Sequence, residues 1–463
     1  MLWEKLKGCS QKTHIALISL VIALMVVARF IGLEDSPPGF YIDESAAASH
    51  ILCLSETGKD ATGKKFPFVY SAGTAGLNTF PYVYSGAVWV KVFGGSPYSL
   101  RAMSAFFTIF TIVGIYFLAR LLSTSETAGY AVLSASIMPW SFHFSRIAWD
   151  PPMAPLFLVW GVYFVLRSNR KFDLVLSGVL FSLAMYSYSP VRVTVPIILL
   201  AILFIKKRQQ LANFKDSLWF LVPLFLSTAP LVWNVLYSPE YMARFHEGNI
   251  ASEWNLRKHG EPSLSLLLTR LVIEFFSHFD PLYLFIHGDK IERHSVQKFG
   301  ELSWLDFLGI LALGGLLISK MARSGLKVFR DVPILVLISV VTILASILPS
   351  AITGPWPHAL HSITAWPFFA LLVGFGIAWA SPRIGVFKYG IGLVALCFSL
   401  FYLHAVFVKY PLFAGPFFDQ ADKQLAVQAA TTGNWREFED NSKNMFYLTK
   451  KYYLMQYGHR ACD

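Results

Sequence analysis

The sequence predicts an all-α polytopic membrane protein with about eleven transmembrane helices. Of its 463 residues, 55% are hydrophobic and 14% are charged, whereas soluble globular proteins carry about 25% charged residues. Apolar runs long enough to cross a bilayer recur along the chain, and the loops between them are mostly short and basic. Lys and Arg collect in the cytoplasmic loops of membrane proteins, so these loops also orient the chain.

The first apolar run, residues 15–32, predicts a membrane helix that is not cleaved off. Three lysines precede it and place the N-terminus in the cytoplasm. No small-residue cleavage pattern follows the run, so we do not expect a removed signal peptide. Further spans are predicted at residues 100–122, 128–144, 152–166, 174–188, 191–205, 218–236, 304–319, 332–348, 363–380 and 389–408.

Two outer loops are long, at residues 33–99 and 237–303, and we expect interfacial helices in both. In the first loop, residues 44–57 have helical composition and a mixed surface, which is typical of a helix lying at the membrane interface. Residues 80–93 carry several aromatic side chains, which favour the headgroup level.

The distribution of charge supports this topology. The predicted inner loops hold basic clusters near residues 167–171, 206–215, 320–330 and 383–388. An odd number of spans leaves the C-terminus on the outer face. The chain thus divides into an integral membrane domain, residues 1–410, and a short extracytoplasmic tail, residues 411–463. The net charge of +11 does not indicate nucleic-acid binding, because the basic residues form no single patch or tail.

Two adjacent acids, Asp43 and Glu44, are separated by four residues from the Pro37-Pro38 pair that ends the first span. Ionisable residues beside hydrocarbon are costly and usually mark a functional site. A carboxylate can act as a general base, and guanidinium groups match phosphate oxygens. The candidate catalytic residues are Asp43, Glu44 and Asp150; the candidate substrate- and phosphate-binding residues are Arg146, Tyr188, Arg192, Arg293, His294 and His358.

Simpler explanations remain open for several of these residues. Asp43 could cap a helix that begins at Glu44, since Asp is a favoured N-cap residue. Arg146 and Asp150 are four residues apart and could form a local helical ion pair. Arg192 could anchor the chain at the lipid headgroups. The histidines lack the spacing of a zinc site, so we predict no metal centre, although a divalent cation stays an open alternative.

The same residues belong to short motifs that resemble the GT-C membrane glycosyltransferases, specifically glycosyltransferase family 39. That family contains protein O-mannosyltransferases and lipid A aminoarabinose transferases. The similar pieces follow the family's order and cover roughly residues 15–410. They are residues 37–44, 57–63, 145–148, 188–192, 278–280, 284–289, 293–295, 300–302 and 357–360.

The resemblance implies a GT-C fold and transfer of a sugar from a polyprenyl-phosphate carrier. It also implies that Asp43 is the general base toward the acceptor and that Asp150 is a further carboxylate of the site. The sequence departs from the family pattern in two places. Many relatives carry Glu near position 150, and many carry Arg where His361 stands. These departures bear on the donor or the acceptor rather than on the type of reaction.

The predicted function is therefore transfer of a monosaccharide from a polyprenyl-phosphate donor to an acceptor hydroxyl or amine, as an inverting single displacement. The acceptor could be a protein, a lipid or an envelope glycan. A transporter or flippase of polyprenyl-linked sugars, or a non-catalytic binder of them, remains an alternative. The outer loops lack an Asn-x-Ser/Thr sequence, which favours a bacterial plasma membrane. Cys53 and Cys462 both lie on the predicted outer side and could pair.

Overall fold

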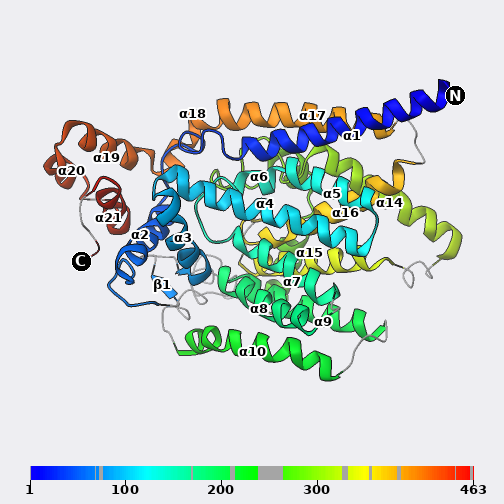
Figure 1. The fold of residues 1–463 in the computed structure, drawn as a ribbon, viewed down its shortest axis with the longest axis horizontal. Helices are drawn as coiled ribbons and strands as arrows, with labels where there is room; N and C mark the ends of the chain where they lie inside the picture. Colours follow the sequence, from blue (N-terminus) through cyan, green and yellow to red (C-terminus); the bar gives the residue numbers. More distant parts are fainter. Residues whose placement is uncertain are drawn as a thin grey trace.

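The computed structural model describes residues 2–67, 69–71, 77–167, 170–208, 214–237, 264–325, 332–353, 357–382, 387–443, 445–458 and 462. Helices dominate this part of the chain, as predicted (Figure 1). The exception is a small antiparallel hairpin of β1, Val69–Ser71, and β2, Leu77–Thr79, which the sequence analysis did not predict.

The predicted spans each correspond to a helix or a pair of helices. Six helices among the described residues are long and apolar enough to cross a membrane, so the predicted count of about eleven is not established. The protein is a multi-pass membrane protein. The helices are α1 Leu2–Ala28, α4 Pro97–Leu122, α5 Ser125–Ile137 with α6 Pro139–Phe144, α7 Met153–Arg167, α8 Lys171–Ser187, α9 Val191–Arg208, α10 Phe214–Tyr237, α14 Trp304–Ser324, α15 Ile334–Thr353, η3 Ile363–Ala365 with α16 Trp366–Ala380, and α17 Phe387–His404 with η4 Ala405–Lys409.

The first outer loop contains the two helices that the sequence predicts. Helix α3 spans Phe80–Phe93 as expected, and α2 spans Ile42–Thr57. Helix α2 begins two residues before Glu44, with Tyr41 as its N-cap, so Asp43 lies inside the first turn. The alternative in which Asp43 caps a helix starting at Glu44 is therefore wrong.

The second long outer loop, residues 237–303, is described from residue 264 onward. Its residues 238–263 lie outside the described part of the chain. It contains α13, Leu264–Ser277, and a short π-helical turn, η1, Tyr283–His287. Helix α13 has a strongly sided apolar surface and no buried residue, which is typical of an interfacial helix. The following segment, residues 288–303, leads into α14 and carries several of the candidate site residues.

The C-terminal segment forms short helices that pack against the first outer loop. They are α18 Pro411–Ala414, η5 Gly415–Phe418, α19 Gln420–Thr432, α20 Trp435–Asn441 and α21 Tyr447–Gln456. In Figure 1, α2, α3 and α19–α21 gather at one end of the long axis, opposite the N-terminus. A disulfide between Cys53 and Cys462 joins this segment to α2.

Candidate active site

Asp43 and Glu44 occupy the first turn of α2, where the helix dipole stabilises negative charge. Glu44 is fully buried and accepts four hydrogen bonds. Arg101 donates two of them at 2.8 and 2.7 Å, the amide of Ala148 donates one at 2.7 Å, and the amide of Tyr41 donates one at 3.0 Å. This carboxylate is occupied by protein donors, so Glu44 acts on the position of the loops rather than directly on a substrate. Asp43, by contrast, is half-buried.

Arg101 of α4 is the centre of this arrangement, although it was not among the residues predicted from the sequence. Besides Glu44, its guanidinium donates to the carbonyls of Leu33 and Pro37, both at 2.7 Å, and of Gly39 at 3.1 Å. All five of its N–H donors are thus engaged, and the Pro-Pro-Gly turn is wrapped around it. The sequence did contain a signal for Arg101, since it is a single arginine near the start of an apolar helix. Charged residues are rare in membrane segments unless they have a role.

Arg146 has a structural role instead of the predicted role as a phosphate ligand. Its five donors all reach backbone carbonyls of the chain between α1 and α2: those of Ala28, Arg29, Gly32 and Ser36, the last accepting twice. The side chain is 2% exposed. No donor is left for a phosphate, so this assignment is corrected. The same contacts leave no donor for the proposed ion pair with Asp150.

Arg293 lies beside the start of α2. The central carbon of its guanidinium is 4.2 Å from the centroid of the Tyr41 ring, within cation–π distance. Burial raises the pKa of Tyr41 to about 12, and the nearby charges of Asp43 and Arg293 act on it in opposite directions. Among the described residues, the buried Nε of Arg293 has no hydrogen-bond partner. A buried donor without a partner is costly, so this atom is suited to an anionic ligand.

Asp289 joins two outer segments that carry the candidate histidines. Its Oδ2 accepts the amide of Ala359 at 2.7 Å and lies 3.1 Å from Nδ1 of His294. Its Oδ1 accepts the amide of Ile291 at 2.9 Å, and its own amide donates to the buried Glu301 at 2.8 Å. The carboxylate therefore fixes His294 next to the segment that bears His358. Asp289 was not among the predicted site residues.

The histidines form a row. The rings of His294 and His358 are 4.7 Å apart, and those of His358 and His361 stack at 3.8 Å. Tyr188, at the end of α8, lies 6.3 Å from His361, which places it at the far end of this row. Burial, followed by the neighbouring histidines, lowers the pKa of His358, so its ring is neutral at physiological pH.

Asp289, His294 and His358 offer ligand atoms that all lie within 4.8 Å of one another. Two imidazoles and one carboxylate are a donor set that suits a transition metal such as zinc. The same Asp289 oxygen already accepts a backbone hydrogen bond and contacts His294. The group is therefore able to hold a divalent cation, and the hydrogen-bond network accounts for the same geometry without one.

Asp150 lies in the turn before α7, and Arg192 lies at the start of α9. The ring of Trp149 is edge-on to Tyr41 at 6.4 Å and lies 5.9 Å from His294, so the turn carrying Asp150 borders the same region. Arg192 is in the first turn of α9 and donates to the carbonyl of Met185 at 3.3 Å. Its assignment as a phosphate ligand, like the headgroup alternative, stays a prediction.

Comparisons with known proteins match the sequence over part of the chain and the fold over most of it. Residues 81–233 match the sequence model of the dolichyl-phosphate-mannose-protein mannosyltransferase family. This match includes Asp150, Tyr188 and Arg192, whereas Asp43 precedes it. No curated protein matches the chain in sequence.

Solved structures show the same fold. ArnT from Cupriavidus metallidurans bound to undecaprenyl phosphate superposes with a TM-score of 0.53 at 14% identity, covering 96% of this chain and 77% of that one. The oligosaccharyltransferase of Archaeoglobus fulgidus, tethered to an acceptor peptide, superposes with a TM-score of 0.52 at 14% identity. The superposition covers 95% of this chain and 59% of the oligosaccharyltransferase. The chain therefore has the GT-C fold of polytopic membrane glycosyltransferases, with a match to the dolichyl-phosphate-mannose-protein mannosyltransferase family over residues 81–233.

Proposed function

We propose that this protein transfers a monosaccharide from a polyprenyl-phosphate carrier to an acceptor hydroxyl or amine on the extracytoplasmic face of the membrane. The fold supports the proposal, because a similarly folded protein, ArnT, is known in complex with undecaprenyl phosphate. The family matched at residues 81–233 uses a polyprenyl-phosphate-linked mannose by its description. The archaeal oligosaccharyltransferase, which has a similar fold, is known with a tethered acceptor peptide, and this supports an acceptor as the second substrate.

The observation that carries the proposal is the placement of an acid and a guanidinium around Tyr41. Asp43 follows Tyr41 by two residues, and Arg293 lies over the Tyr41 ring at 4.2 Å. The two charges come from segments about 250 residues apart in the sequence, so the fold must bring them together. A base for the acceptor and a cation for the departing phosphate are the two groups that sugar transfer from a phosphate requires.

The reaction is a single displacement with inversion. Asp43 accepts the proton of the acceptor hydroxyl or amine as that atom attacks the anomeric carbon of the sugar. The bond between this carbon and the phosphate oxygen breaks, and its electron pair leaves with the polyprenyl phosphate. Arg293 stabilises the negative charge on the leaving phosphate, since guanidinium pairs with phosphate oxygens in a bidentate manner.

The neighbouring residues assist these two. His294 and His358 are positioned by Asp289 to donate hydrogen bonds to the phosphate or the sugar, while Arg192 and Asp150 border the reacting groups. Orientation of the reactants contributes the larger share, on the order of 7–11 kcal/mol. A general base contributes about 100- to 10,000-fold in rate. The polytopic fold accommodates the lipid tail of the donor between its helices.

Transfer by the purified protein in lipid nanodiscs tests the proposal. The donors are undecaprenyl-phosphate mannose, glucose and aminoarabinose, offered with peptide, lipid A and envelope-polymer acceptors. We expect donor-dependent labelling of one acceptor class. Uptake or translocation of the donor without any labelled product would instead support the flippase alternative.

A matched pair of arginine variants tests the role of Arg293. Arg293→Gln should weaken undecaprenyl phosphate binding about 10- to 100-fold, because a charge-assisted hydrogen bond to phosphate is lost. Arg436→Gln, on the exposed surface of α20, serves as the control for a change of net charge. Equal binding by both variants would rule out Arg293 as the phosphate partner.

A further inference from the structure

Asp419, at the start of the C-terminal segment, caps the helix that carries Asp43. Its Oδ2 accepts the amide N–H of Ile42 at 2.8 Å. Ile42 is the first residue of α2, and the N–H groups of a first turn have no partner within their own helix. The capping oxygen comes from 377 residues further along the chain. The N-terminal end of α2 is therefore completed by the C-terminal segment.

The backbone around Asp419 is seated closely against the Pro-Pro-Gly turn. Gly39 has a φ of +78°, and a Cβ atom added there would lie 2.1 Å from the carbonyl oxygen of Phe418 and 2.8 Å from the amide nitrogen of Gln420. Both contacts are with backbone, which cannot move aside without shifting the segment. Only glycine permits this approach, so Gly39 in the first outer loop and Asp419 in the C-terminal segment form one fitted contact.

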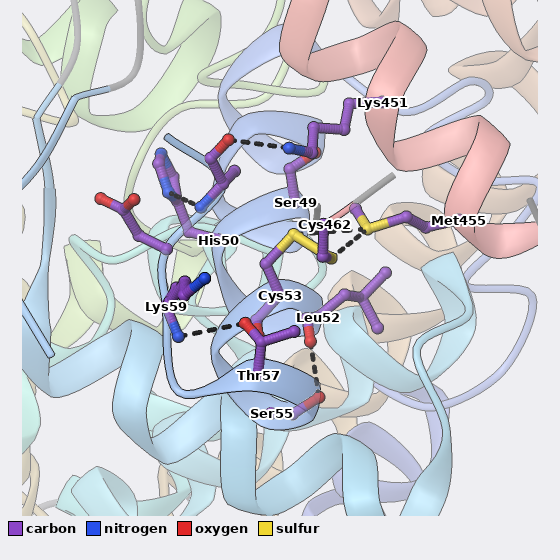
Figure 2. The surroundings of a disulfide bond; sticks show 12 residues. Ser49, His50, Leu52, Cys53, Ser55, Thr57, Lys59, Lys451, Met455 and Cys462 are labelled. Carbon is purple, nitrogen blue, oxygen red and sulfur yellow. Dashed lines mark hydrogen bonds between the residues drawn. A yellow bond between two sulfur atoms is a disulfide. The ribbon is translucent and has the colours of Figure 1, made fainter. Parts of the chain in front are cut away.

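The C-terminal segment is attached to α2 at several separate points. The Cys53–Cys462 disulfide holds its far end, and Figure 2 shows this bond beside Met455 of α21. Between the two ends, Ser45 and Thr449 share a hydrogen bond of 2.6 Å, and Ser49 donates to the carbonyl of Leu448 at 2.6 Å. Asp419 is thus held by a segment with several independent attachments to the same helix.

We propose that Asp419 is a positioning residue for Asp43. In this proposal the C-terminal segment, which is held by the disulfide, helps to set the geometry of the active site. This inference rests on the proposed function, in which Asp43 is the base. The hydrogen bond from Ile42 fixes the peptide unit between Tyr41 and Ile42, one unit before the one that leads into Asp43. The amide of Tyr41, in the preceding peptide unit, is fixed by Glu44. The two bonds hold the backbone that leads into Asp43, so that its carboxylate faces the acceptor while Arg293 faces the phosphate.

Hydrogen–deuterium exchange tests the cap without requiring activity. In the full-length protein in nanodiscs, Asp419→Ala should make exchange at the start of α2 about 5- to 30-fold faster, which is the expected effect of losing an N-terminal cap. Asp419→Asn retains a side-chain oxygen and should exchange as the wild type does. Asp422→Ala removes a carboxylate one turn further along α19 and is the matched control. Unchanged exchange in Asp419→Ala would overturn the cap.

Kinetics with the best donor and acceptor found for the wild type test positioning. Asp419→Ala should lower kcat at least about tenfold with little change in KM for the donor, since misplacement of a reacting group lowers the rate of chemistry. Asp419→Asn should restore most of this rate. Gly39→Ala, which displaces Phe418 and Asp419, should reproduce the loss. A variant Asp419→Asn as inactive as Asp419→Ala, with wild-type exchange, would overturn positioning in favour of a direct role for the charge.

The exchange and kinetic experiments together distinguish a failure of this inference from a failure of the proposed function. Absence of transfer by the wild type with every donor and acceptor would refute the proposed function, and with it the assignment of Asp419 as a positioning residue. The exchange result would still decide whether Asp419 caps α2. Active wild type combined with normal kinetics in Asp419→Ala would refute the positioning role alone.

Discussion

Asp43 and Glu44 are adjacent in the sequence, yet their carboxylates meet different surroundings. Glu44 is enclosed by Arg101 and two backbone amides. Asp43 stays half-buried at the same helix end. Adjacent residues on a helix diverge in direction, so the two carboxylates do not share one environment. The two acids therefore have different roles: Glu44 holds the loop in place through its hydrogen bonds, and Asp43 is the proposed base.

This division predicts opposite results for the two acids. Glu44→Ala leaves Arg101 buried without its countercharge and should cost about 3–5 kcal/mol of stability. We expect a clear fall in the thermal unfolding temperature and in the yield of folded protein. The double variant with Arg101→Leu should recover part of the loss, because the uncompensated charge is removed. Glu44→Ala with wild-type unfolding would contradict the structural role of Glu44.

His278 makes the stability of the folded protein depend on pH. Burial lowers its pKa from 6.5 to about 4, and the ring is held between Ser350 at 2.7 Å and the carbonyl of Glu274 at 2.8 Å. The unfolded chain binds a proton at this histidine below about pH 6.5, whereas the folded protein does so only near pH 4. Stability should therefore fall as the pH drops from 6.5 toward 4.

Thermal unfolding between pH 7.5 and 4.5 measures this dependence. We expect His278→Asn, which keeps a donor for the Glu274 carbonyl, to show a shallower fall than the wild type. A variant that loses stability as steeply as the wild type would show that other groups cause the dependence.

At the scale of elements, helix α2 is organised by contacts that no local pattern specifies. Glu44 and Asp419 accept hydrogen bonds from the amides at its N-terminal end. Its buried side packs against α21, and its Cys53 forms a disulfide with Cys462. Sequence composition predicted α2 almost to its true length. Its first residue was misplaced because the cap on Ile42 comes from a segment far along the chain. Composition alone carries no information about such a contact.

The disulfide should stabilise the C-terminal segment without affecting the membrane helices. In the double variant Cys53→Ser/Cys462→Ser, we expect amide exchange in α21 to become at least several-fold faster, while α5 and α16 keep their protection. The segment retains its hydrogen bonds to Ser45 and Ser49, so it should loosen rather than detach. Cys397, which is unpaired, provides the control as Cys397→Ser. Equal exchange in α21 of both variants would show that the disulfide adds no stability.

At the scale of the whole molecule, the motif resemblance predicted the GT-C fold, and hydropathy and loop charge predicted the membrane helices and their order. These signals are strong because a membrane segment must be apolar and helical over its full length. The site was predicted less completely. As the predicted topology led us to expect, contacts link the segments that carry Asp43, Arg293, His294 and His358. The guanidinium of Arg146 instead donates to backbone carbonyls. A charged side chain near a membrane face looks the same in sequence whether it binds a ligand or the chain itself.

The proposed orientation places the N-terminus in the cytoplasm and the C-terminal segment outside. Glu439→Cys, at an exposed position of α20, should react with a membrane-impermeant maleimide in intact cells. The native Cys9, beside the N-terminal lysines, should react only after the membrane is permeabilised, and Cys9→Ser should abolish that labelling. Labelling in the reverse pattern would place the site on the cytoplasmic face and contradict the proposed topology.

The most direct test of the central claim compares Asp43→Asn with Asp35→Asn in purified, lipid-reconstituted protein. Asp35 is an exposed acid of the same loop and controls for the change of charge. We expect Asp43→Asn to lose sugar transfer by about 100- to 10,000-fold, with wild-type thermal unfolding and undecaprenyl phosphate binding, and Asp35→Asn to remain active. Turnover by Asp43→Asn close to that of the wild type would contradict its role as the base.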